Sequence, residues 1–152
     1  MPQSTLALLY SLRDKANEYG VNMYLTGGSA RDILLTQPFQ DLDIVLDHDA
    51  PNFAAKVAKE LFGTVKCHTQ FGTATVTIND HKIDFSTARQ EIYSRPGSLP
   101  DISHSSIEED LDRRDFTINS IGICLSVDSF GYIHDPHDGL EDIQSKTLRI
   151  LH

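Results

Sequence analysis

Two aspartates stand two positions apart in an apolar run, at Asp41 and Asp43 of the segment DLDIVL. In a β-strand, residues two apart point to the same face, so both carboxylates would project together while Leu42, Ile44 and Leu46 face a core. Carboxylates held side by side disfavour each other's ionisation, and a divalent cation removes that repulsion. Magnesium suits the pair because it prefers hard oxygen ligands and is often bound by one or two carboxylates with substrate phosphates. A solvated strand face is the alternative explanation.

Two adjacent glycines, Gly27 and Gly28, precede these aspartates and fall between a predicted strand and a predicted helix. Without side chains, their backbone N–H groups can approach a phosphate closely, and a helix N-terminus favours negative charge. Arg31 follows in the first turn, where its planar guanidinium can bind the same anion. The pattern is neither a P-loop nor a Rossmann fingerprint. A tight turn that requires positive φ is the alternative.

A third carboxylate, Asp84, stands between two apolar residues in the run IDF. If this strand pairs beside residues 41–46, Asp84 joins the other two acids. Two-metal phosphoryl transfer uses such an arrangement of carboxylates. The alternative is an aspartate on an edge strand.

Two arginines, Arg113 and Arg114, interrupt the acidic stretch EEDLDRRDFTINS. They could form ion pairs on a solvated helix, which contribute little to stability. Alternatively, one of them points into a cleft and binds nucleotide phosphates.

The elements that must position these residues can be read from the spacing of apolar and turn-forming residues. We expect helices near residues 6–19, 29–35, 50–61 and 138–146 and a short helix that starts near Ser105 and Ser106, with Ser29 and Asp49 near the N-termini of theirs. We expect strands near residues 21–25, 41–46 and 119–127, a hairpin that turns at Asn79 and Asp80, a mobile loop over 94–104, and a terminal strand or extended tail over 148–152. This order predicts an α/β or α+β domain with a small mixed β-sheet flanked by helices.

The composition indicates which broad class of protein this is. The 152 residues are 39% hydrophobic and 23% charged, which is ordinary for one globular domain with a real core. No apolar run is long enough to cross a bilayer and the N-terminus lacks the basic segment of a signal peptide, so we expect a cytoplasmic protein without a membrane partner. Thirteen basic against 22 acidic side chains give a formal net charge of −9, which opposes a non-specific grip on nucleic acid.

Cysteines and histidines indicate no metal centre. Cys67 and Cys124 lack metal-ligand spacing, and Cys124 lies in an apolar run, where we expect a buried free thiol rather than a disulfide. His134 and His137 are close in sequence, but Pro136 breaks any helix that could align them, so an ordinary turn is favoured over a zinc site.

Taken together, the motifs resemble the head domain of the class II tRNA nucleotidyltransferases and bacterial poly(A) polymerases, within the polymerase-β-like nucleotidyltransferase superfamily. The matching segments, in family order, are LTGGSARDILL, DLDIVL, IDFSTARQEIY, SIEEDLDRRDFTINSIGI and DPHDGLEDIQSKTLRIL. Each segment alone is weak, but the ordered set is specific and covers nearly the whole chain after about residue 20. The resemblance implies that residues 1–152 form a single nucleotidyltransferase head domain.

The resemblance also implies roles for particular residues. The implied catalytic residues are Asp41, Asp43 and Asp84, of which Asp41 and Asp43 bind catalytic Mg²⁺. The implied nucleotide-binding residues are Gly27, Gly28, Arg31, Arg114 and Asn119. Asp84 stands where relatives often carry glutamate, so this chain keeps the charge on a shorter side chain.

The implied reaction is attack by the 3′-hydroxyl of an RNA, either a tRNA CCA end or a poly(A) tail, on the α-phosphate of ATP or CTP. Pyrophosphate leaves, metal ions neutralise the developing charge, and no template is used. In the family, base choice and the grip on tRNA come from neck, body and tail regions that this chain lacks, so RNA would be bound through those regions. An excised head domain and a naturally short protein that needs a partner both fit. The nucleotide added, the RNA used and the oligomeric state stay open.

Two other functions stay open as well. A nucleotide-binding or regulatory module without turnover fits a head domain that lacks its neck, although the intact carboxylates argue against a degenerate site. Transfer of a nucleotide to a protein or small molecule occurs elsewhere in the superfamily, but the RRDFTIN stretch is typical of the branch that acts on RNA. Incubation with labelled ATP or CTP and tRNA separates the three.

Overall fold

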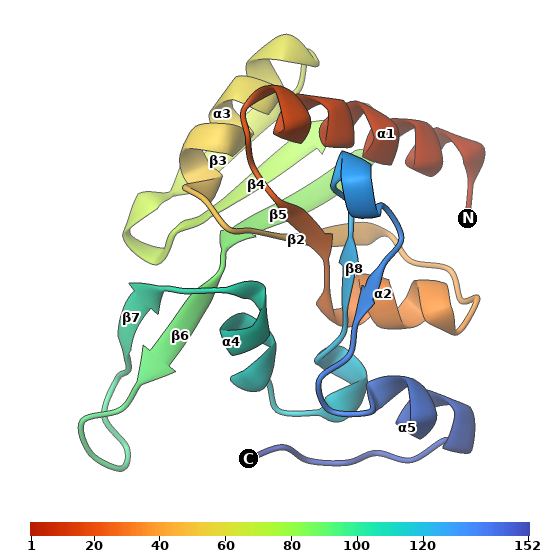
Figure 1. The fold of residues 1–152 in the computed structure, drawn as a ribbon. Coiled ribbons are helices and arrows are strands. Elements are labelled where there is room, and N and C mark those ends of the chain that lie inside the picture. The colour runs from red at the N-terminus through yellow and green to blue at the C-terminus, as the bar shows by residue number, and fades with distance from the viewer.

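The computed structural model describes the backbone of residues 1–152 and the side chains of all of them except Ile102. The helices are α1 (Gln3–Glu18), α2 (Gly27–Leu34), α3 (Ala50–Glu60), α4 (Ile107–Asp112) and α5 (Gly139–Ser145), with short 3-10 helices η1 (Thr69–Phe71), η2 (Thr117–Asn119) and η3 (Val127–Ser129). The strands are β1 (Met23–Leu25), β2 (Asp41–Leu46), β3 (Thr64–His68), β4 (Thr73–Ile78), β5 (His81–Thr87), β6 (Arg89–Ile92), β7 (Asp101–His104), β8 (Gly122–Cys124) and β9 (Ile133–His134). The predicted mixed α/β architecture is confirmed (Figure 1).

The main sheet has seven strands in the order β3-β4-β5-β2-β1-β8-β9. Its central pair, β2 and β5, is parallel, and the other neighbouring pairs are antiparallel. A parallel pair needs a long crossover, which α3, β3 and β4 supply here. This crossover brings Asp84 of β5 into register with Asp43 of β2.

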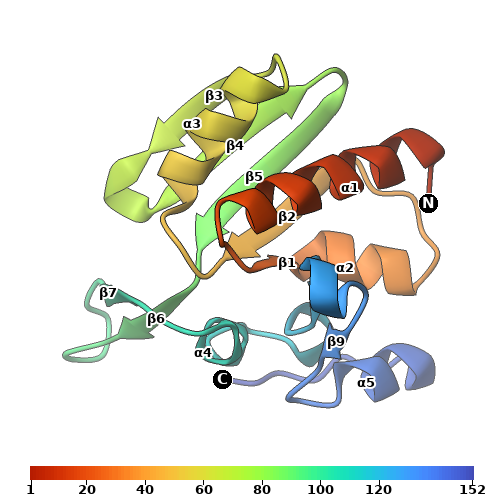
Figure 2. The same ribbon diagram turned by 45° about the horizontal axis from the view of Figure 1, so that its top comes forward.

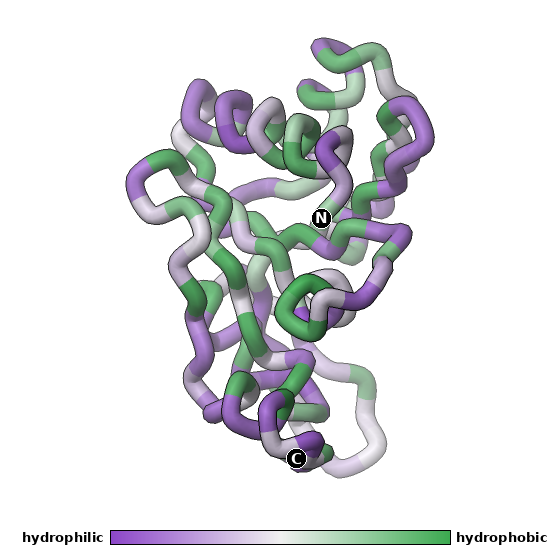
Figure 3. Tube along the Cα trace, turned by 90° about the vertical axis from the view of Figure 1, so that its right-hand side faces the viewer, coloured by the Kyte–Doolittle hydropathy of each residue, from purple (hydrophilic) through white to green (hydrophobic). Residues whose placement is uncertain are grey.

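The main hydrophobic core lies between the sheet and two helices, α1 and α3, which run side by side over the same face (Figures 1 and 2). Hydrophobic and hydrophilic residues alternate along the helical turns (Figure 3), as expected for helices with one buried face. From α1 the buried side chains include Leu8, Leu9 and Leu12, and each fully buried leucine stabilises the fold by roughly 1.5–3 kcal/mol. A smaller cluster on α4 and β2 joins Ile107 and Leu111 to Val45.

Local signals in the sequence set several element ends correctly. Asp49 is the N-cap of α3, where its side chain accepts a hydrogen bond from the Asn52 backbone N–H. Ser106 and Glu109 form a complete capping box at the start of α4. The hairpin that joins β4 to β5 turns at the predicted place, and Cys124 is a buried free thiol as expected.

The sequence analysis missed four strands. Strands β3, β6 and β9 were not expected, and the loop predicted over 94–104 ends in β7, which pairs with β6 as a separate two-stranded sheet. Strand β3 has no buried side chain and β9 has only two residues, so neither shows the alternation by which strands are recognised. The final residues, 148–152, form an extended tail that makes one isolated bridge between Phe116 and Ile150.

Among the helices that the structure describes, none combines the length and the apolar character needed to cross a membrane.

Candidate active site

A cleft of about 560 Å³ opens where the β1–α2 turn meets strands β2, β4 and β5 and the segment after α4. Its size is that of a small-ligand pocket. Six of the eight predicted site residues line it, and these are Gly27, Gly28, Asp43, Asp84, Arg114 and Asn119. The other two, Asp41 and Arg31, lie next to lining residues without being part of the lining. The tertiary structure therefore gathers most of the predicted site into one concave surface.

A single residue, Thr26, separates β1 from helix α2 and is the N-cap residue of the helix, whose first position is Gly27. Gly27 has φ +59°, and a Cβ atom there would lie 3.3 Å from Arg114 Nη1 and 3.4 Å from Asp43 Oδ2. A glycine is needed both for this left-handed backbone and for the close approach of an arginine and a carboxylate. Gly27 and Gly28, in the first turn of α2, both line the cleft, so the N-terminus of this helix lies at the cleft wall.

The prediction that Ser29 caps this helix was wrong. Ser29 lies inside α2 and is buried, and its Oγ donates to the Thr26 carbonyl at 3.0 Å and accepts from the Asp43 backbone N–H at 3.0 Å. The serine therefore fastens the start of α2 to β2 at the level of the candidate catalytic carboxylate. From sequence, a serine near the start of a helix is expected to cap it. The local sequence does not show that Ser29 accepts a hydrogen bond from the backbone of β2 instead.

The two carboxylates in the cleft, Asp43 and Asp84, come from the adjacent parallel strands and are in register. Burial raises the pKa of Asp43, and the nearby Asp84 charge raises it further, against the lowering effect of Arg114. Asp84 Oδ1 accepts a hydrogen bond of 2.7 Å from Thr75 Oγ1, which orients that carboxylate. Ionisation of Asp43 beside Asp84 is therefore disfavoured, and a cation held between the two carboxylates would favour it.

Lysine Lys82 pairs with two of the predicted acids. Its Nζ lies 3.4 Å from Asp41 Oδ2 and 3.3 Å from Asp84 Oδ2, and these carboxylates raise the pKa of the lysine, Asp84 most strongly. Lys82 is opposite Asp41 in the β2–β5 register and two residues before Asp84, so all three side chains share one sheet face. Sequence analysis did not single out Lys82, although its spacing from Asp84 was a usable signal.

The donor set fits a magnesium ion that also binds a substrate. Asp43 and Asp84 supply hard carboxylate oxygens, and Asp41 lies at the start of the same strand face. Within the part of the chain that the structure describes, no three His, Cys, Asp or Glu side chains converge as a ready-made metal site. Two carboxylates completed by phosphate oxygens and water are the usual surroundings of Mg²⁺ in phosphoryl-transfer sites.

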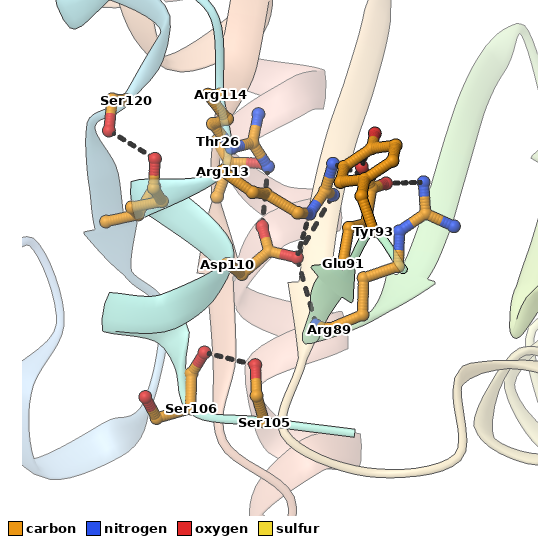
Figure 4. A network of polar contacts seen from close by, with 11 residues as sticks. Thr26, Arg89, Glu91, Tyr93, Ser105, Ser106, Asp110, Arg113, Arg114 and Ser120 are labelled. Carbon is orange, nitrogen blue, oxygen red and sulfur yellow. Dashed lines mark hydrogen bonds and ion pairs between the residues drawn. The ribbon is translucent and has the colours of Figure 1, made fainter. Parts of the chain in front are cut away.

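Of the two adjacent arginines, Arg114 lines the cleft and Arg113 does not. Arg114 Nη2 donates to Asp110 Oδ2 at 2.9 Å and to Thr26 Oγ1 at 3.3 Å (Figure 4). Arg113 lies against Asp110 Oδ1 at 3.1 Å and Glu91 Oε1 at 3.6 Å. Of the two predicted alternatives, the ion pair within the helix region describes Arg113 and the cleft position describes Arg114.

Arg31 contacts the site through a neighbouring residue. Its Nη1 donates to Asn119 Oδ1 at 2.9 Å, and its Nη2 lies 2.9 Å from Asp32 Oδ1. Asn119 is in η2 and lines the cleft. In this structure Arg31 thus orients Asn119 while its own guanidinium lies at the edge of the cleft.

Comparison with known proteins gives consistent matches. Residues 23–149 match the family model described as the poly A polymerase head domain. An A-adding tRNA nucleotidyltransferase of Halalkalibacterium halodurans is 45% identical over 148 residues, which cover 97% of this chain and 35% of that protein. A solved CCA-adding enzyme in its second apo form matches all of this chain and 36% of its own, with 34% identity and a TM-score of 0.93. A tRNA nucleotidyltransferase solved with a primer tRNA and an incoming ATP analog matches 93% of this chain and 39% of its own, with 35% identity and a TM-score of 0.82. The chain spans little more than a third of the length of these proteins.

Proposed function

The chain belongs to the family of the poly A polymerase head domain, and from that premise we propose that it is the catalytic head of an enzyme that adds nucleotides to RNA 3′ ends. The substrate would be ATP or CTP, the acceptor the 3′-hydroxyl of an RNA, and the leaving group pyrophosphate. The observation that carries the proposal is the convergence of Asp43, Asp84 and Arg114 on a glycine turn at a helix N-terminus. Such a cleft offers acids for a cation and N–H donors for a triphosphate.

The triphosphate would lie over the β1–α2 turn. Gly27 and Gly28 leave the backbone N–H groups open to phosphate oxygens, and the dipole of α2 favours their negative charge. Arg114 adds a guanidinium beside the Gly27 turn, and Asn119, oriented by Arg31, adds an amide. These groups bind and orient the nucleotide without changing their own protonation state.

Asp43 and Asp84 would hold the metal, with Asp41 as a further ligand at the start of β2. Bound Mg²⁺ neutralises charge on the phosphates and polarises the attacking hydroxyl in reactions of this class. The raised pKa of Asp43 is consistent with this role, because a carboxylate that is unfavourably ionised gains most from a cation.

RNA would be held outside residues 1–152, which we propose to be one head domain of a longer enzyme type with neck, body and tail regions. The net charge of −9 supports this division, because it opposes a direct grip on a polyanion. A relative solved with a primer tRNA and an ATP analog, and another solved with CTP, make tRNA the first acceptor to test.

The test is a calorimetric titration of the chain with ATP and CTP, with and without Mg²⁺. We expect magnesium-dependent binding with little preference between the two bases, and binding of AMP at least about 10-fold weaker because it lacks the β- and γ-phosphates. Addition of labelled ATP and tRNA then separates transfer from binding. Binding without transfer by this chain fits both a nucleotide-binding module and a head that needs its RNA-binding regions, and restoring those regions separates the two. Failure to bind either triphosphate would contradict the proposed site.

A change at Lys82 tests the metal assignment separately. Its ammonium competes with a metal for Asp41 and Asp84, so Lys82→Gln should tighten Mn²⁺ binding by about 2- to 5-fold, the range expected for half-exposed ion pairs. Electron paramagnetic resonance of free Mn²⁺ in the absence of nucleotide measures the affinity. Lys66→Gln, on the exposed edge strand β3, removes the same charge elsewhere and serves as the control. Equal affinities in the two variants would show that Lys82 does not compete for the site.

A further inference from the structure

One buried carboxylate in α4, Asp110, is absent from the predicted site although it contacts a residue of the cleft. Its side chain is 0% exposed, in an acidic stretch for which a solvated helix was one of the two alternatives. Burial of a charge is strongly unfavourable unless partners surround it, so the identity of those partners indicates what Asp110 does.

The two oxygens of Asp110 hold different partners (Figure 4). Oδ1 accepts hydrogen bonds from the Arg89 backbone N–H at 3.1 Å, from Arg113 Nε at 3.2 Å and from Arg113 Nη2 at 3.1 Å. Oδ2 accepts from Arg114 Nη2 at 2.9 Å. One oxygen therefore ties α4 to the first residue of β6, and the other holds the arginine that lines the cleft.

Arg114 has few other contacts that could fix its guanidinium. The Thr26 hydroxyl accepts from Nη2 at 3.3 Å, and the buried Nε has no hydrogen-bond partner among the described residues. Nη1 points to the Gly27 turn, since a Cβ atom on that glycine would lie 3.3 Å away. Asp110 thus holds the Arg114 guanidinium through an ion pair at Nη2, and Nη1 is directed at the Gly27 turn.

The network of Figure 4 leaves Arg114 available on the cleft side. Asp110 and Glu91 pair with Arg89, Arg113 and Arg114, and Glu91 lies against Arg89 and Arg113 but not against Arg114. Arg114 Nη1 and Asp43 Oδ2 both lie against the Gly27 turn, so the guanidinium also has a carboxylate of the cleft near it. A phosphate that reaches Nη1 meets a guanidinium whose side chain is already ordered, which lowers the entropy lost on binding.

We propose that Asp110 is a positioning residue for nucleotide binding, which acts through Arg114 by holding its guanidinium against the Gly27 turn. The inference rests on the proposed function, because it takes the triphosphate as the ligand of Arg114. It assigns a role in the site to a residue that does not itself line the cleft.

Asp110→Asn is the sharpest variant, because the structure determines how the amide must lie. Three N–H donors surround Oδ1, so the amide oxygen takes that place and the amide NH₂ faces Arg114 Nη2, donor against donor. The variant keeps the contacts that support the fold and releases Arg114. We expect about 10-fold weaker binding of Mg·ATP, as for loss of one charge-assisted hydrogen bond.

A double-mutant cycle shows whether the effect passes through Arg114. In an Arg114→Gln background, Asp110→Asn should weaken Mg·ATP binding little further. Asp110→Glu keeps the charge and should restore part of the affinity. Glu91→Gln is the matched control, because it neutralises the other carboxylate of the network, which pairs with Arg113 but not with Arg114, and it should leave affinity close to that of the unmodified chain. Additive losses in the double variant would overturn the proposal.

A second measurement needs no nucleotide. Nitrogen-15 NMR of the arginine side chains should show restricted rotation of the Arg114 guanidinium in the unmodified chain and in Glu91→Gln, and averaged signals in Asp110→Asn. If the unmodified chain binds no triphosphate, the proposed function fails, and the NMR comparison still decides whether Asp110 orders Arg114. An Arg114 guanidinium that stays equally restricted in Asp110→Asn would refute the inference; if that variant does not fold, unrestricted rotation in the unmodified chain is the refuting result.

Discussion

Replacing Asp43 with asparagine is expected to abolish nucleotide transfer and, at the same time, to raise the free energy of unfolding of the metal-free chain at neutral pH. The variant removes a proposed metal ligand, and loss of the several kcal/mol that a catalytic metal contributes corresponds to about 1,000-fold or more in rate. It also removes a charge that is unfavourable in the folded state, because burial and the Asp84 carboxylate raise the pKa of Asp43. Function and stability would therefore change in opposite directions.

The pH dependence of this stabilisation has a definite sign. A carboxyl group whose folded-state pKa lies above its unfolded value of 3.8 destabilises the fold most at pH values above the raised pKa. That destabilisation declines as the pH falls through the raised pKa and is gone below the unfolded value. The advantage of Asp43→Asn should accordingly be present at neutral pH and vanish in acid.

Urea unfolding with and without Mg²⁺, together with incorporation of labelled ATP into tRNA, measures both effects. Magnesium should stabilise the unmodified chain more than Asp43→Asn, since ligands that bind only the native state shift its stability by mass action. Asp128→Asn, an exposed acid in η3, is the control for a change of one charge. Full transfer activity in Asp43→Asn, or equal magnesium stabilisation of both proteins, would contradict the metal assignment.

Substitution of Gly27 by alanine should weaken triphosphate binding by about 100-fold, the second largest effect that we expect. The added methyl group would lie 3.3 Å from Arg114 Nη1 and 3.4 Å from Asp43 Oδ2, so it would displace two charged groups of the cleft and cover the backbone that a phosphate must approach. Loss of two charge-assisted hydrogen bonds accounts for an effect of this size. Calorimetric titration with Mg·ATP measures it.

Backbone strain has to be separated from the loss of the site. Gly27 and Gly20 both have positive φ, +59° and +68°, but a Cβ atom on Gly20 meets nothing within 4 Å. Each alanine should destabilise the fold by about 1–2 kcal/mol, because both place an L-residue in the left-handed region. Only Gly27→Ala should lose nucleotide affinity. Similar affinities for the two variants would show that the turn does not hold the triphosphate.

The sequence alone determined the parts of the fold that depend on local regularity. Alternation in DLDIVL predicted both the strand and the face that carries Asp41 and Asp43, because side chains in a strand alternate whatever lies beyond it. The N-cap at Asp49 and the capping box at Ser106 were equally local, since a cap is satisfied within one helical turn. The ordered set of motifs was sufficient to indicate the family.

Only the tertiary structure decided which of these residues meet. The parallel register of β2 and β5 makes Asp43 a neighbour of Asp84, and no local pattern encodes a register across a crossover. The missed strand β3 is also defined by its neighbour, because its backbone pairs with β4 while none of its side chains is buried. Register is set by which faces the whole sheet must bury, so it follows from packing rather than from propensity.

The same reason explains the side chains whose roles sequence could not assign. A helix as short as α4 has too few residues for its periodicity to show a buried face, so Asp110 reads as one acid among several and Arg113 as equivalent to Arg114. Packing of α4 against β2 buries Asp110 and directs Arg114 to the cleft, with Arg113 toward Glu91. The sequence thus shows which charged residues are present in this segment. Which of them pair, and which face the cleft, is determined by the packing of α4.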